Sequence, residues 1–140
     1  MIDTDFEEML KKVQKKIQSE EEATYSTTVI NEYRNPTMFG KMKNPDTMGM
    51  IKGSCGDTMR FELKIRNDII SDIRFWTDGC GASIACGNML AKMAFGKNLR
   101  EVESITQKLL LNSLNGLPSE HIHCSNLAVN TLRLSIKQYR

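Results

Sequence analysis

Three cysteines lie in contexts that favour metal binding or thiol chemistry over packing in a core. Cys55 and Cys80 each stand beside glycine, and the glycines let the backbone bend closely around a bound species. Cys124 directly follows His123. Asp57 and His123 are natural candidates for a fourth ligand, because imidazole and carboxylate groups bind transition metals alongside thiolates. The set predicts a metal or cluster site that can be filled and also emptied.

These cysteines are far apart in the sequence, so only the fold can bring them together. No Cys-x-x-Cys pair is present, which argues against a zinc ribbon and a thioredoxin-type redox centre. Cys86 falls on the apolar face of an expected helix and is interpreted as a small core residue. Asp57 taken alone is better explained by capping a turn. His121 is as well explained as a solvated surface residue.

Two of the thiols are expected to be reactive because of their place in the chain. Cys80 precedes an expected helix, and Cys124 lies at the start of the last one. Unpaired backbone N–H groups and the helix dipole favour thiolate there, so we expect a lowered pKa at both. Thiolates placed together repel each other, so a bound cation is expected to hold them.

Composition excludes several classes of function. The 140 residues carry 19 Lys and Arg against 17 Asp and Glu, a net charge of +2. This is too small a positive charge to indicate binding to nucleic acid. No apolar run approaches the ~20 residues of a membrane span, and the first residues are acidic and polar, unlike a signal peptide. We therefore expect a cytoplasmic protein without nucleic-acid or membrane partners. Its cysteines are then ligands or catalytic thiols, because disulfides are rare in that compartment.

The middle of the chain is expected to form a sheet. Apolar and charged residues alternate strictly at 59–66, which predicts a strand with one buried face. Asn67 and Asp68 predict a turn, after which residues 69–77 return, and residues 49–54 supply a shorter third strand. The remaining segments have helical spacing. The sequence thus predicts an α+β domain, a three-stranded antiparallel sheet packed on one side by helices.

An extra N-terminal helix is predicted at residues 3–20, with residues 21–24 as a hinge. Thr4 starts a capping-box pattern. Apolar residues then recur at helical spacing: Phe6, Met9, Leu10, Val13 and Ile17. A second helix is expected at 26–34, ending before Pro36 because the residue that precedes a proline is disfavoured in a helix.

At its cysteines the chain resembles the U-type iron–sulfur cluster assembly scaffolds, the family of IscU and the N-terminal domain of NifU. The resemblance divides the chain into an N-terminal extension at residues 1–24 and a scaffold domain at residues 25–140. It is carried by four ordered motifs: Tyr25-Ser26 with Tyr33-Arg34-Asn35-Pro36, Cys55-Gly56-Asp57, Gly79-Cys80-Gly81-Ala82-Ser83, and His123-Cys124-Ser125-Asn126-Leu127-Ala128.

The resemblance implies a scaffold on which Cys55, Cys80 and Cys124 assemble a [2Fe–2S] cluster from iron and persulfide sulfur. Asp57 would be a labile ligand or gate, and His123 a neighbouring or alternative ligand. Cys124 is the first candidate for accepting persulfide sulfur, and Cys80 is the second. Zinc also suits this ligand set and would fit the isolated protein. No enzymatic turnover is expected.

The resemblance also implies partners. They are a PLP-dependent cysteine desulfurase, an electron donor such as a ferredoxin, an iron source and acceptor apoproteins. In the family, a DnaK-type chaperone recognises a Leu-Pro-Pro-Val-Lys stretch. Here residues 117–121 are Leu-Pro-Ser-Glu-His instead, so binding of that chaperone is not expected. Three alternative roles are open for residues 3–20: packing on the sheet, pairing two protomers in a homodimer, or docking the desulfurase.

Two other functions stay open at this point. One is a zinc-binding sulfur-transfer partner or activator of a cysteine desulfurase, with Cys124 as a relay thiol. The chain has no long insertion between Cys80 and Cys124, which argues against the zinc-binding SufU type. The other is a purely structural zinc domain.

Overall fold

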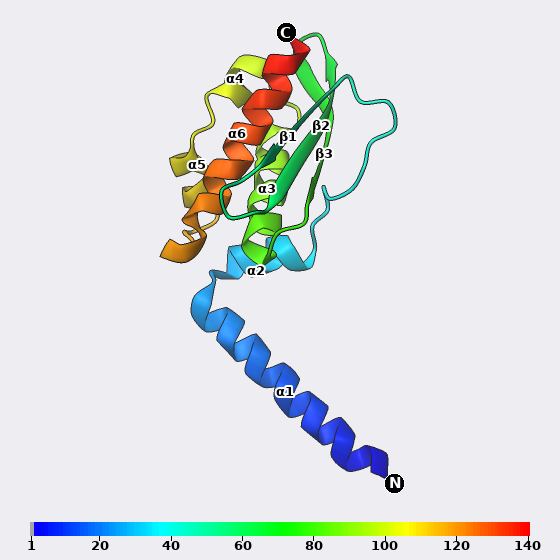
Figure 1. Ribbon diagram of the computed structural model, residues 1–140, viewed down its shortest axis with the longest axis vertical. Coiled ribbons are helices and arrows are strands. Elements are labelled where there is room, and N and C mark those ends of the chain that lie inside the picture. Colours follow the sequence, from blue (N-terminus) through cyan, green and yellow to red (C-terminus); the bar gives the residue numbers. More distant parts are fainter. Residues whose placement is uncertain (1) are drawn as a thin grey trace.

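The computed structural model describes residues 2–140, with the side chains of residues 5–16 and 24–140. Helices come first, then strands, then helices again (Figure 1). In chain order they are α1 (Ile2–Thr24), α2 (Thr27–Arg34), β1 (Thr47–Lys52), β2 (Thr58–Arg66), β3 (Ile69–Thr77), α3 (Gly81–Ala94), α4 (Leu99–Glu103), α5 (Gln107–Ser113), a 3-10 turn (Ser119–His121) and α6 (Ile122–Tyr139).

The predicted α+β class is confirmed. The strands form one antiparallel sheet in the order β1-β2-β3, and Figure 1 shows α3 and α6 on one face of it. Asn67 and Asp68 form the predicted turn, and both have positive φ (52° and 62°), as in the tight turns that hairpins favour. The face toward the helices is fully buried: Met59, Phe61, Leu63, Ile73 and Phe75.

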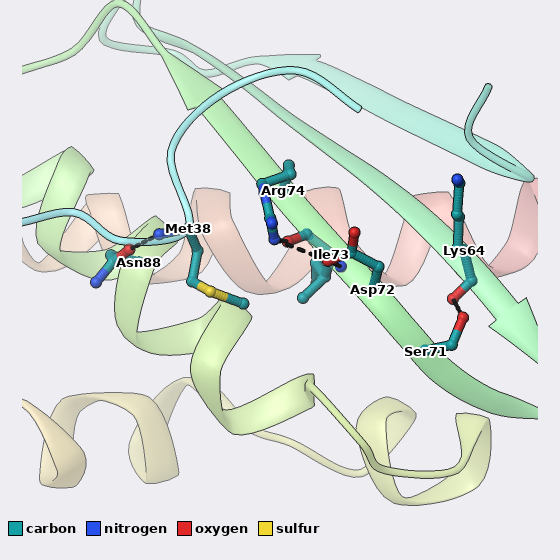
Figure 2. A network of polar contacts seen from close by, with 7 residues as sticks. All are labelled: Met38, Lys64, Ser71, Asp72, Ile73, Arg74 and Asn88. Atoms are coloured by element: carbon teal, nitrogen blue, oxygen red, sulfur yellow. Dashed lines mark hydrogen bonds and ion pairs between the residues drawn. The ribbon is translucent and has the colours of Figure 1, made fainter. Parts of the chain in front are cut away.

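A loop between α2 and β1 covers the outer edge of β3. The Gly40 N–H donates to the carbonyl of Phe75 (2.9 Å), and the Phe75 N–H donates to the carbonyl of Met38 (3.0 Å). Figure 2 shows the Met38 N–H bonded to Asn88 Oδ1 of α3 (2.8 Å). The same view shows Arg74 on β3 paired with Asp72 at 2.8 Å. This edge is therefore unavailable for pairing with a strand of another chain.

Close contact between β1 and α6 depends on Gly49. A Cβ built there would lie 2.5 Å from Ser135 Oγ and 2.7 Å from Ser135 N. The second of these is a backbone atom of α6 and cannot rotate away. Strand and helix therefore fit together only while residue 49 has no side chain.

Replacing Gly49 with alanine should lower the free energy of unfolding by about 1–3 kcal/mol, the usual cost of overpacking. Met50→Ala is the matched control, since Met50 is the next residue of β1 and is exposed. Its effect should stay within about 0.5 kcal/mol. Urea denaturation measures both, and equal midpoints for the two variants would contradict the packing argument.

The N-terminal helix is longer than predicted. α1 runs through Thr24, so the hinge expected at residues 21–24 is wrong. The chain turns at Ser26 instead, whose hydroxyl accepts a hydrogen bond from the Val29 N–H (3.1 Å) and caps α2. The capping box expected at Thr4 is also wrong, because the helix begins at Ile2 and Thr4 lies inside it.

Figure 1 shows α1 extending away from the rest of the chain. Its apolar stripe does not pack on the sheet: the exposed fractions of Phe6, Met9, Leu10 and Val13 are 55%, 54%, 43% and 49%. Ile17, the fifth residue of the predicted stripe, lies outside the described side chains. Over the described residues, no helix combines the length and apolar character that crossing a bilayer requires.

Candidate metal centre

Segments that are far apart in the sequence meet beside the candidate cysteines. Figure 1 shows the starts of α3 and α6 at the same end of the sheet, near α2. Cys80 is the extended residue that precedes α3, and Cys124 lies in the first turn of α6. Cys55 lies in the turn between β1 and β2. Cys55 and Cys80 are exposed, whereas Cys124 is buried.

The turn that holds Cys55 is built by short backbone hydrogen bonds. The Gly53 N–H donates to the carbonyl of Asp57 (2.7 Å), and the Gly56 N–H donates to the carbonyl of Gly53 (3.0 Å). Gly56 has φ +95°, a conformation that favours glycine. Gly56 is thus needed for the bend, and the bend leaves Cys55 at the surface.

The closest group of candidate ligand atoms comprises Cys80, His121 and Cys124. Their ligand atoms all lie within 4.8 Å of one another, and Cys80 Sγ is 3.9 Å from His121 Nδ1. Among the described residues, this is the group that brings three such atoms together, and Cys55, Asp57 and His123 fall outside it. His121 thus lies beside two thiols. From the sequence, it was as well explained as a solvated surface residue.

Asp57 reaches this group through the hydroxyl of Ser83. Ser83 Oγ lies 3.4 Å from Asp57 Oδ2 and 3.3 Å from Cys124 Sγ. A Cβ on Gly79 would lie 2.8 Å from Asp57 Oδ2 and 2.5 Å from Ser83 Oγ. The glycine before Cys80 therefore makes room for the carboxylate beside the thiols.

Cys124 also lies close to His123. His123 Nε2 lies 3.7 Å from Cys124 Sγ. His123 and Cys55 also line one cavity of about 260 Å³. Cys124 is thus near His123 and also belongs to the group with Cys80 and His121.

Burial raises the pKa of the Cys124 thiol to about 11, although the hydrogen bond from Ser83 lowers it; the negative charges of Cys80, Cys55 and Asp57 raise it further. The lowered pKa expected for Cys124 is therefore wrong. Its position in the first turn of α6 favours thiolate, but the loss of solvent outweighs that effect. The metal-free protein therefore holds Cys124 as a neutral thiol at neutral pH.

Cys86 is fully buried in α3, and burial raises the pKa of its thiol well above the usual value. This agrees with its interpretation as a core residue.

Alkylation of Cys124 in the metal-free protein should depend steeply on pH. Below a pKa of about 11 the thiol keeps its proton, and only the thiolate reacts. The rate should rise about ten-fold per pH unit from pH 8 to pH 10, after the exposed Cys55 and Cys80 have reacted. Mass spectrometry of peptides after iodoacetamide pulses measures this. A rate for Cys124 that levels off near pH 8 would contradict the raised pKa.

Sequence reasoning missed two residues of this site. Ser83 follows Cys80 by three positions, the spacing that places two side chains on one face of a helix, and this signal could have found it. His121 gave a weaker signal, because its place depends on the 3-10 turn before α6.

Comparison with known proteins identifies relatives over most of the chain. The model of the NifU-like N terminal domain matches residues 24–140. The iron–sulfur cluster assembly scaffold protein IscU of Aquifex aeolicus is 38% identical over 118 residues, which cover 82% of this chain and 75% of that protein. IscU of Escherichia coli K12 is 36% identical over 121 residues, covering 83% of this chain and 94% of that protein.

A solved structure supports the fold. The N-terminal part of a nitrogen-fixing NifU-like protein from Brucella abortus matches with a TM-score of 0.63 at 18% identity. The match covers 81% of this chain and 92% of that one.

Proposed function

Because the chain belongs to the family of NifU-like N-terminal domains, we propose that it is a scaffold on which iron–sulfur clusters are assembled and from which they are passed to acceptor proteins. The observation that carries this proposal is that the ligand atoms of Cys80, His121 and Cys124 all lie within 4.8 Å of one another. Asp57 lies beside the hydroxyl of Ser83, which also contacts Cys124. Thiolate and imidazole suit iron and zinc. A scaffold of this kind has no turnover of its own.

We propose that the cargo is a [2Fe–2S] cluster held by Cys55, Cys80 and Cys124. Asp57 serves as the labile fourth ligand, and His123 as its alternative. A carboxylate binds iron less tightly than a fourth thiolate does, so the cluster can leave. The exposure of Cys55 and Cys80 supports this role, since an acceptor must reach the cluster from solvent.

Sulfur is proposed to arrive as the persulfide of a cysteine desulfurase. Cys124 is the first candidate acceptor and Cys80 the second. The acceptor thiolate attacks the outer sulfur, a new S–S bond forms, and the desulfurase leaves as a thiolate. Reduction of that sulfur to sulfide takes electrons from ferrous iron and from a donor such as a ferredoxin. Buried Cys124 must first lose its proton, and a bound metal ion favours that loss.

We also propose the division into an extension at residues 1–24 and a scaffold domain at residues 25–140. The start of the family match at residue 24 supports it, as does the way α1 leaves the rest of the chain (Figure 1). The exposed stripe of α1 suits a second copy of the chain or the desulfurase as its partner. The cytoplasm is the proposed location, because this thiol chemistry needs a reducing compartment.

Anaerobic reconstitution tests the scaffold function. The protein is incubated with ferrous iron, sulfide and a reductant, and its visible absorption is followed before and after an apo-ferredoxin is added. A charge-transfer spectrum that disappears as the ferredoxin gains its cluster is the expected result. A colourless protein that keeps zinc and only accelerates a cysteine desulfurase would instead identify it as a sulfur-transfer partner. Zinc without any effect on the desulfurase would identify a structural zinc domain.

A further inference from the structure

We propose that His121 is a metal ligand and that Cys80, His121 and Cys124 hold the first metal ion to enter the site. This rests on the proposed scaffold function and specifies how assembly begins. The ion is a first-row divalent cation, Fe²⁺ during assembly and Zn²⁺ in the isolated protein, because two thiolates and one imidazole suit these ions better than Mg²⁺ or Ca²⁺.

The distances fit such an ion. Zinc–sulfur bonds of about 2.3 Å and zinc–nitrogen bonds of about 2.0 Å place the ligand atoms of a tetrahedral site about 3.5–3.8 Å apart. Cys80 Sγ and His121 Nδ1 are 3.9 Å apart. No pair in the group, which includes Cys124, exceeds 4.8 Å.

The His121 ring is held in place before any ion binds. Its backbone N–H donates to the carbonyl of Pro118 (2.9 Å) and fixes the 3-10 turn. Its ring lies 5.7 Å from the ring of Tyr25, and Tyr25 in turn lies 6.2 Å from Tyr33 in an edge-to-face arrangement. The ring is thus in contact with Tyr25 and also with the thiol of Cys80.

Three protein ligands leave one tetrahedral position open. Ser83 links Asp57 to Cys124, so we assign the Asp57 carboxylate to that position, which it can give up to incoming sulfur. His123 lies 3.7 Å from Cys124 Sγ but outside the ligand group, and it lines a cavity together with Cys55. The two histidines therefore serve different positions, and His121 serves the first ion.

Nuclear magnetic resonance of the full chain labelled with ¹⁵N-histidine tests this directly, since the chain has two histidines. Anaerobic addition of one equivalent of Zn²⁺ should shift the Nδ1 resonance of His121 to the range of metal-bound imidazole. The His123→Gln variant assigns the two signals. If one equivalent of Zn²⁺ shifts the His123 nitrogens and leaves His121 unchanged, the proposal is overturned.

A variant gives the second test. Losing a group that only orients a ligand typically costs about 10- to 100-fold in metal affinity, so His121→Gln, which removes a ligand, should weaken Zn²⁺ binding about 100-fold. Glu120→Gln is the control, because Glu120 is exposed in the same turn and lies outside the ligand group. Affinity is measured by competition with a chromophoric chelator, and circular dichroism checks that each variant is folded.

Cluster reconstitution of the same variants separates the two proposals. If His121→Gln binds Zn²⁺ like the parent while the parent still builds a cluster, the ligand proposal fails and the scaffold function stands. If the parent builds no cluster but His121→Gln loses Zn²⁺ affinity, the scaffold function fails and the metal site stands.

Discussion

Replacing Cys124 with serine should abolish cluster assembly. The Sγ atom of Cys124 lies 3.7 Å from His123 Nε2 and within 4.8 Å of the ligand atoms of Cys80 and His121. A serine hydroxyl occupies nearly the same volume, but it does not supply the soft thiolate that iron–sulfur chemistry requires. The visible absorption after anaerobic reconstitution should therefore fall at least about ten-fold, as expected when a metal site loses a central ligand.

Cys86→Ala is the matched control for this experiment. It also removes a buried thiol from the same region, since Cys86 lies in α3, the helix that Cys80 precedes. Its sulfur is outside the ligand group, so the variant should build a cluster to the same extent as the parent at a temperature where both are folded. Equal assembly by Cys124→Ser and the parent would exclude Cys124 as a ligand. Loss of assembly in Cys86→Ala alone would indicate that the cluster binds to the buried thiol of Cys86 in the core.

The sheet could be predicted from the sequence because its signals are strong and agree with one another. Strict alternation at 59–66 fixes which face is buried, and a shift of one residue would expose Phe61 and Leu63. Asn67 and Asp68 tolerate positive φ better than most residues. Together these local signals specify the β2–β3 hairpin, which then buries one face against the helices.

The end of α1 could not be predicted, because competing local preferences there are of similar size. Acidic residues near a helix C-terminus are unfavourable by a few tenths of a kcal/mol to about 1 kcal/mol. Glutamate and alanine at positions 20–23 favour helix by comparable amounts. The helix continues to Thr24 and ends where Ser26 can cap the next one.

The meeting of Cys80 and Cys124 was predictable from their places at the starts of two helices, but the identity of the histidine beside them was not. On an extended segment His121 and His123 would point the same way. In the structure a 3-10 turn leads directly into α6, and two residues of a helix are about 200° apart around its axis. The two rings therefore need not point the same way, and among the described residues His121 is the one that joins Cys80 and Cys124. The pKa of Cys124 was unpredictable for a related reason, because burial of the first turn of α6 follows only from the packed fold.

Asp57→Ala should give a cluster that stays on the protein longer. We expect its transfer to an apo-ferredoxin to slow about ten-fold, equivalent to about 1.4 kcal/mol of activation free energy. The reason is the position of Asp57, whose carboxylate contacts the Ser83 hydroxyl that donates to Cys124. From there the carboxylate can compete with sulfur for iron, and this competition loosens the cluster. The measurement is the decay of scaffold absorption after the acceptor is added, with equal cluster loading in both proteins.

Asp57→Asn shows which property of the carboxylate matters. Asparagine keeps the size of the side chain and an oxygen that can accept the Ser83 hydrogen bond, but it removes the charge and most of the affinity for iron. If Asp57 acts as a labile ligand, the asparagine variant should transfer its cluster as slowly as the alanine variant. If the carboxylate only positions Ser83, asparagine should behave like the parent while alanine differs. Transfer by both variants at the rate of the parent would remove Asp57 from the release step, and the exposed thiols of Cys55 and Cys80 would then be the groups that the acceptor displaces.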